Sequence, residues 1–294
     1  MKVTADPKLM AELRRDVDKL AVEVGERHSG LVWEIAEVAD YLALELESAA
    51  YEVERQGLVV DAGRVVVQNL SAKLRGGSRG DESLVIATYY DSAPGSRGAD
   101  DNATGTAAVL ALARQLRDAR PDRTLRFVFL VNEQEPFAGT ELMGSLHFAR
   151  LLASGGERVA ATLVLSRLGA SVVAKVGARG VSVGLRVEGP SWADPLVARV
   201  SQLLARSIQV SVARTSTGRG AAGFWQAGIP AVVLSSANDG VVGPGSESTI
   251  DYAAMARRVD ALAAVVTSLA AVSDPQSATL PSSLPQRLPA RRPP

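Results

Sequence analysis

The sequence contains no cysteine and only two histidines, His28 and His147, among its 294 residues. The lack of cysteine excludes a disulfide framework and thiolate chemistry, and the shortage of histidine limits any metal site or catalytic triad. Lysine and arginine together number 32, as do aspartate and glutamate, so the net charge is zero. The chain therefore lacks the basic excess of a nucleic-acid-binding protein, and we expect no nucleic-acid partner.

Long apolar runs are also missing. No segment approaches the roughly 18 consecutive apolar residues of a membrane-spanning helix, so we expect no membrane partner. The first residues, MKVTADPKLMAELRRD, have no apolar core of signal-peptide length, and we expect a cytoplasmic protein. Apolar residues nevertheless make up 47% of the chain, which is enough for one large domain or two small ones.

Short apolar segments alternate with amphipathic helical segments over most of the chain. This alternation predicts an α/β protein, a three-layer sandwich whose central mixed sheet is mostly parallel. We expect residues 1–272 to form one domain. From 273 to 294 the chain is rich in serine, proline and arginine, and we expect a disordered tail. The main predicted helices are 7–24, 31–49, 102–116, 141–153, 192–206 and 251–270, and the main predicted strands are 51–60, 64–74, 84–87, 124–131, 161–165, 208–213 and 231–234.

The stretch from Leu84 to Leu116 organises this pattern. A buried strand ends near Ala87, a polar glycine-rich loop follows, and a mostly apolar helix begins near Asn102. The loop carries three acidic residues where the strand ends: Asp91, Asp100 and Asp101. In open α/β sheets ligands bind at this edge, although aspartates here could equally cap the following helix.

Two glycine motifs suggest functions that their surroundings do not support. Residues 218–223 match GxGxxG, but barely one helical turn follows before Gly228 and Pro230, and a dinucleotide site needs a full crossover helix there. Residues 76–80 match GxSxG, yet they lie in a predicted loop between strands, with no helix to form a nucleophile elbow.

Several longer motifs resemble one enzyme family. They are, in order along the chain, TYYDSAPGSRGADDNATG, RTLRFVFLVNEQEPFAGTELMGS, GFWQAGIPAVVL and STIDYAAMARRV. Together they resemble the co-catalytic zinc aminopeptidases, metallopeptidase family 28. The resemblance implies the α/β fold of that family and a pair of zinc ions bridged by one carboxylate, with a glutamate as general base.

Only part of the implied site is present. The resemblance assigns the bridging carboxylate to Asp101, the general base to Glu133 and the aspartate that orients the first histidine ligand to Asp91. The implied ligand positions otherwise carry residues that bind zinc poorly at neutral pH: Tyr89, Gln134, Ser166 and, near the end of the domain, Val241. We therefore expect no cofactor, although the family would use two zinc ions.

Three functions fit this pattern. The first is a non-catalytic, aminopeptidase-like domain, or pseudopeptidase, that binds a peptide or protein partner and in which Glu133 is a vestigial base. The second is an active metallo-aminopeptidase with a remodelled site, for two metals or for one, around Asp91, Asp101 and Glu133. The third is metal-free acid–base chemistry by the same carboxylates together with Tyr89 or Tyr90.

Without cations, the clustered carboxylates of the pocket, Asp100 among them, would repel one another and resist burial. Two arginines lie at positions implied to contact metal or substrate, Arg167 and Arg219. A guanidinium stays charged and can bridge two carboxylates with its planar fork. Strand alternation places Arg167 on the face opposite Ser166, so we expect Arg219 to be the internal counter-ion of Asp101 or Glu133.

Overall fold

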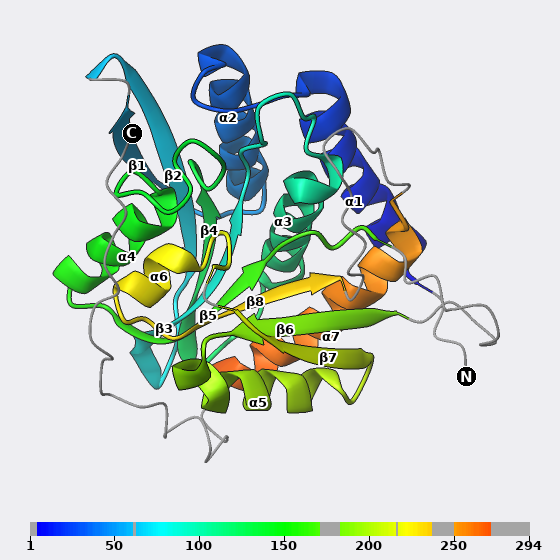
Figure 1. The fold of residues 1–294 in the computed structure, drawn as a ribbon. Coiled ribbons are helices and arrows are strands. Elements are labelled where there is room, and N and C mark those ends of the chain that lie inside the picture. Colours follow the sequence, from blue (N-terminus) through cyan, green and yellow to red (C-terminus); the bar gives the residue numbers. More distant parts are fainter. Residues whose placement is uncertain (1–4, 61–62, 171–182, 216, 237–249, 272–294) are drawn as a thin grey trace.

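The computed structural model describes residues 5–60, 63–170, 183–215, 217–236 and 250–271. Its centre is a twisted eight-stranded mixed sheet with helices on both faces (Figure 1). The predicted fold class is therefore confirmed. The predicted tail, 273–294, and the implied ligand position Val241 lie outside the described residues.

The helices, in chain order, are α1 (Pro7–Asp18), η1 (Lys19–Val24), α2 (Val32–Ser48), η3 (Ala99–Ala103), α3 (Thr104–Leu116), α4 (Gly144–Ser154), η4 (Ser191–Ala193), α5 (Asp194–Leu204), α6 (Ala222–Gln226) and α7 (Tyr252–Ala270). The strands are β1 (Val53–Val60), β2 (Val65–Leu74), β3 (Arg79–Tyr89), β4 (Arg123–Leu130), β5 (Arg158–Leu165), β6 (Gly184–Gly189), β7 (Gln209–Arg214) and β8 (Ala231–Ser236).

The strand order in the sheet is β1-β2-β4-β3-β5-β8-β6-β7. The central strands β4, β3, β5 and β8 run parallel to their neighbours in this group, whereas β1–β2, β2–β4 and β6–β8 are antiparallel pairs. Parallel strands bring their carboxyl ends to one edge of the sheet. The loops that follow β3, β4 and β5 therefore meet at that edge, which is where the sequence predicts a site.

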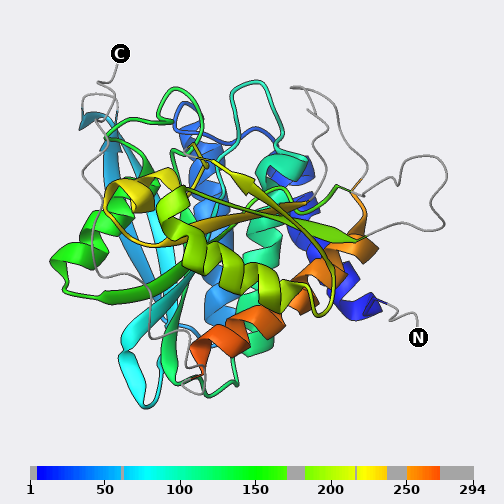
Figure 2. The ribbon, with the colours of Figure 1, turned by 60° about the horizontal axis from the view of Figure 1, so that its bottom comes forward.

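Alternate residues of β3 pack on opposite faces of the sheet, into two separate apolar clusters. Leu84 and Ile86 pack into the larger core beneath α1, α3, α5 and α7, whereas Val85 and Ala87 pack against the layer of α4 and α6. Figure 1 shows α4 and α6 side by side at the left, and Figure 2 shows α5 and α7 together in front of the sheet. Both faces are covered, so apolar residues predominate on both sides of the central strands.

Local capping signals mark the starts of two helices correctly. Asp6 accepts a hydrogen bond from the backbone N–H of Lys8 and Pro7 begins α1, while Asp251 accepts one from Ala254 at the start of α7. The predicted loop that contains residues 76–80 is partly wrong, because β3 already begins at Arg79, which pairs with Arg123 of β4 before the register shifts.

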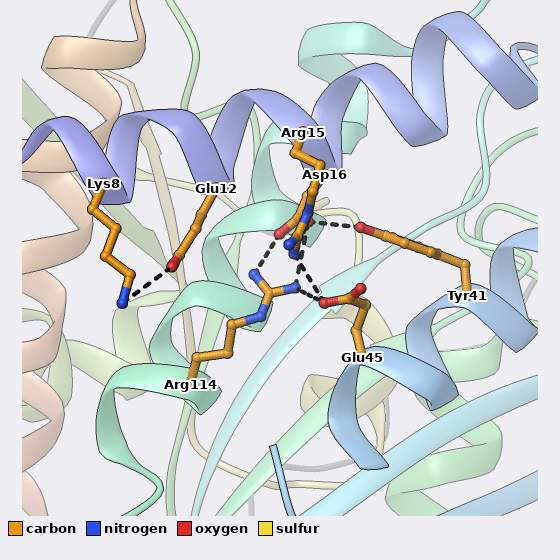
Figure 3. Close-up of polar contacts among 7 residues, drawn as sticks. All are labelled: Lys8, Glu12, Arg15, Asp16, Tyr41, Glu45 and Arg114. Atoms are coloured by element: carbon orange, nitrogen blue, oxygen red, sulfur yellow. Dashed lines mark hydrogen bonds and ion pairs between the residues drawn. The ribbon is translucent and has the colours of Figure 1, made fainter. Parts of the chain in front are cut away.

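A buried carboxylate connects three helices on one side of the sheet (Figure 3). Asp16 of α1 is fully buried. It accepts hydrogen bonds from Tyr41 Oη of α2 and Arg114 Nη1 of α3, each at 2.6 Å. Glu45 of α2 pairs with Arg15 Nη2 at 2.9 Å and also with Arg114. The network therefore fixes α1, α2 and α3 relative to one another.

Replacing Asp16 with alanine is expected to lower the free energy of unfolding by about 3 kcal/mol, because Arg114 and Tyr41 lose their buried acceptor while Glu45 remains as a second partner of Arg114. Urea denaturation measures the loss. Glu12→Ala on the same helix is the matched control. Its partner Lys8 is 3.9 Å away with a side chain 84% exposed, so the change should stay below about 1 kcal/mol. Equal losses for the two variants would contradict this account.

Candidate functional site

The predicted acidic residues gather at the carboxyl edge of the central strands. Tyr89 ends β3, Glu133 and Gln134 follow β4, and Ser166 follows β5. Asp101 comes from η3, after the long loop that leaves β3, and Arg219 comes from the loop before α6. Residues far apart in the sequence thus meet where ligands bind in folds of this class.

Asp101 is the centre of a hydrogen-bonded cluster. Tyr89 Oη donates to Asp101 Oδ1 at 2.6 Å and lies 2.9 Å from Ser166 Oγ. Gln134 Nε2 makes a longer contact of 3.4 Å with the same carboxylate oxygen. Arg219 Nη1 donates to the other oxygen, Oδ2, at 2.8 Å, so the ion pair expected from the sequence is present. Both oxygens of Asp101 are therefore engaged within the chain.

Tyr89 remains a neutral phenol in this cluster. Its side chain is buried, and burial followed by the charge of Asp101 raises the pKa of Tyr89 well above its ordinary value. The hydroxyl group therefore donates a hydrogen bond to Asp101 and does not become a phenolate. Arg219 behaves in the opposite sense. Burial alone would lower its pKa, but the charge of Asp101 and contact with Tyr89 raise it.

Glu133 is held by the backbone. It is 1% exposed; Oε1 accepts the N–H of Ser145 at the start of α4 at 2.6 Å, and Oε2 accepts the N–H of Gly220 at 2.9 Å. Gly220 adopts a φ of +72°, which favours glycine. The glycines that match GxGxxG therefore allow a turn whose N–H reaches Glu133, and α6, with five residues, is too short for a dinucleotide crossover.

Asp91 is buried with one oxygen unpaired. Its Oδ2 accepts the backbone N–H groups of Glu133 at 2.9 Å and Gln134 at 3.1 Å, while Oδ1 has no hydrogen-bond partner among the described residues. Burial, and then the charge of Glu133, raise the pKa of Asp91 to about 7. Under the family resemblance this aspartate would orient a histidine, and the chain has Tyr89 at that position instead.

Sequence reasoning missed Arg27, which is fully buried beside these loops. Its guanidinium donates to five main-chain oxygens, and the bonds to Tyr90 and Gly98 measure 2.7 and 2.9 Å. Burial lowers the pKa of Arg27 to about 10, although the charges of Asp91 and Asp101 oppose that shift. Arg27 thus ties the loop after β3 to the α1–α2 connection. A lone arginine in a polar segment carries no sequence signal of this role.

The remaining predicted pocket residues lie around the cluster without joining it. Asp100 Oδ1 accepts the N–H of Gly169 at 2.8 Å, and Tyr90 Oη donates to the main-chain oxygen of Gln68 at 2.6 Å. Arg167 is exposed, and its backbone N–H donates to Asn102 Oδ1 at 2.9 Å. The structure therefore brings Tyr89, Asp101, Gln134, Ser166 and Arg219 into one cluster, beside Asp91 and Glu133.

These side chains do not fit a pair of zinc ions. Within the part of the chain that the structure describes, no three histidine, aspartate or glutamate side chains converge as a metal site would require. A neutral phenol, an amide and a hydroxyl group are poor zinc donors beside Asp101. The charge that a metal would supply at Asp101 is provided here by Arg219 at 2.8 Å.

The raised pKa of Asp91 predicts a pH dependence of stability. Between about pH 4 and pH 7 the folded protein keeps the Asp91 proton while the unfolded chain releases it, so stability falls as pH rises through this window. The loss should reach a few kcal/mol, at about 1.4 kcal/mol for each tenfold change in proton affinity. Asp91→Asn, which keeps an acceptor for the two N–H groups, should be more stable relative to wild type at pH 8 than at pH 4. Urea denaturation at both values measures this, and a pH-independent difference would contradict it.

Comparisons with known proteins agree on the fold. The zinc aminopeptidase BSAP from Bacillus subtilis superimposes with a TM-score of 0.72 at 14% identity, over 91% of this chain and 97% of that one. The glutaminyl cyclase of Porphyromonas gingivalis gives a TM-score of 0.68 at 18% identity, over 90% and 99% of the two chains. At these identities the likeness shows the fold alone.

Sequence relatives match shorter stretches. Aminopeptidase YwaD of Bacillus subtilis is 36% identical over 65 residues, which are 22% of this chain and 13% of that protein. A vacuolar membrane protease of Candida albicans (strain WO-1) is 29% identical over 103 residues, 33% of this chain and 12% of that protein. The chain thus spans a small part of these relatives. No helix within the described ranges has the length and apolarity needed to cross a membrane.

The prediction that no cofactor is used is wrong, because these comparisons contradict it. The structures that share the fold include zinc aminopeptidases, a finding that speaks against an expectation of no cofactor, although the described side chains are unsuited to a zinc pair.

A family model matches a longer part of the chain and identifies its family. The model described as Peptidase family M28 matches residues 69–242, more than half of the 294-residue chain. The resemblance noted in the sequence is therefore confirmed, and this chain belongs to peptidase family M28.

Proposed function

We propose that this M28 domain is non-catalytic and binds a peptide or protein partner at the carboxyl edge of its sheet. The observation that carries the proposal is the state of Glu133. A general base must reach a water molecule or substrate proton, whereas each oxygen of this buried carboxylate already accepts a backbone N–H group. Glu133 thus connects the start of α4 to the Gly220 turn, which is a structural role.

Asp101 supports the same proposal. In an active relative a carboxylate at this position would share its charge with metal ions and substrate. Here its two oxygens are used by Tyr89, Gln134 and Arg219. The competing proposal is a metallo-aminopeptidase with a remodelled site, which the zinc aminopeptidases that share the fold favour. The two proposals differ in what Glu133 does, and Glu133 is therefore the residue to change.

Glu133→Gln separates the two functions. The glutamine amide has only one acceptor oxygen, so its NH₂ group must face the N–H of either Ser145 or Gly220. We expect a stability loss of roughly 1–3 kcal/mol. We also expect no hydrolysis of aminoacyl anilides above background by wild type or variant, with or without added zinc.

Denaturant unfolding and a chromogenic anilide assay give the two readouts. Glu135→Gln, the same chemical change at an exposed carboxylate two residues along the chain, is a control that leaves both bonds of Glu133 in place. Turnover by the wild-type protein that zinc increases and that Glu133→Gln abolishes would reject the non-catalytic function and support the enzyme.

A further inference from the structure

We infer that the edge of the sheet around Arg219 recognises an anionic group of a ligand, a peptide carboxylate, and does not recognise an amino group. This inference rests on the proposed binding function and names the chemistry that the site selects. Two observations support it: the carboxylate acceptors at this edge already accept hydrogen bonds within the chain, and guanidinium donors of Arg219 face solvent.

The acceptors that an incoming ammonium group needs are largely occupied. Both oxygens of Asp101 and both oxygens of Glu133 accept hydrogen bonds from within the chain. The unpaired oxygen of Asp91 belongs to a side chain that is 2% exposed. An ammonium group arriving here would have to share Asp101 with the positive charge of Arg219, or lose its water to reach the buried Asp91 and Glu133, and both are costly.

The donors that a carboxylate needs are available. The Arg219 side chain is 46% exposed, and its hydrogen bond to Asp101 uses Nη1. Among the described residues its other polar contact is with the hydroxyl group of Tyr89. A guanidinium carries five N–H donors in a planar fork that fits a carboxylate. Asp101 and Tyr89 therefore hold the group in place while part of its fork stays open.

The arginine side chains at this edge are also more exposed than the carboxyl groups beside them. Asp91 and Glu133 are almost fully buried, and Asp101 is 33% exposed, less than Arg219 above it. Arg167, at the end of the neighbouring strand β5, is exposed, and its charge acts on Asp100. The carboxyl groups thus lie beneath the edge and the two guanidinium groups lie nearer its surface, so an approaching ligand meets the arginines first.

Three peptides that differ only at their ends test the inference: N-acetyl-trialanine with a free carboxylate, its C-terminal amide, and trialanine amide with a free amine. The readout is the NMR signal of the Arg219 side-chain Nε–H in the full chain. We expect a saturable shift with the free carboxylate and none with the other two peptides. Arg219→Gln should weaken carboxylate binding by about tenfold or more. For this variant the backbone amide signals are the readout. Asp101→Asn, which removes the competing anion, should tighten binding several-fold.

Two exposed residues provide controls of matched charge. Arg206→Gln and Asp118→Asn alter the net charge by the same amounts, and we expect them to change affinity less than twofold. The inference is overturned if the amine peptide binds in preference, if the carboxylate gives no saturable shift, or if the site variants and their controls behave alike. Zinc-dependent anilide turnover together with carboxylate selectivity would reject the proposed function but leave this inference intact.

Discussion

The ion pair between Arg219 and Asp101 is the interaction on which the rest of the site depends. The fold brings four carboxyl groups, those of Asp91, Asp100, Asp101 and Glu133, to one edge of the sheet, and burial penalises each negative charge. Arg219 supplies a fixed positive charge at 2.8 Å from Asp101 Oδ2, and Tyr89 supplies a neutral donor on the other side. The cluster is thereby satisfied by side chains that belong to the same chain.

Backbone groups hold the remaining charges and in doing so fix the loops. Glu133 joins the start of α4 to the Gly220 turn that carries the neighbouring Arg219, and Asp91 joins the end of β3 to the loop after β4. Arg27 connects the loop after β3 to the segment before α2. Each of these bonds holds a loop of this edge against another segment of the chain, so the charged side chains are positioned by contacts within the protein.

Much of the fold could be predicted because its signals are local. Asp6 with Pro7 marks the start of α1, Asp251 marks α7, and the apolar run at Leu84 marks the central strand. The family motifs also placed Asp91, Asp101 and Glu133 at one edge. Contacts between distant segments were harder to foresee. Arg27 has no periodic or motif signal, and neither the hydrogen bond between Tyr89 and Ser166, 77 residues apart, nor the backbone partners of Glu133 can be read from a single sequence. The prediction that no cofactor is used was wrong. It was drawn from the zinc-ligand types that are missing at the implied positions, whereas structures with the same fold include zinc aminopeptidases.

A double-mutant cycle on Arg219 and Asp101 tests the internal compensation of charge most directly. Urea unfolding of wild type, Arg219→Ala, Asp101→Asn and the double variant gives the coupling between the two side chains. We predict that Arg219→Ala destabilises the fold and that adding Asp101→Asn restores part of the loss. Because the side chains are 46% and 33% exposed, the coupling should be on the order of 1 kcal/mol. Additive effects, with no recovery in the double variant, would contradict the account.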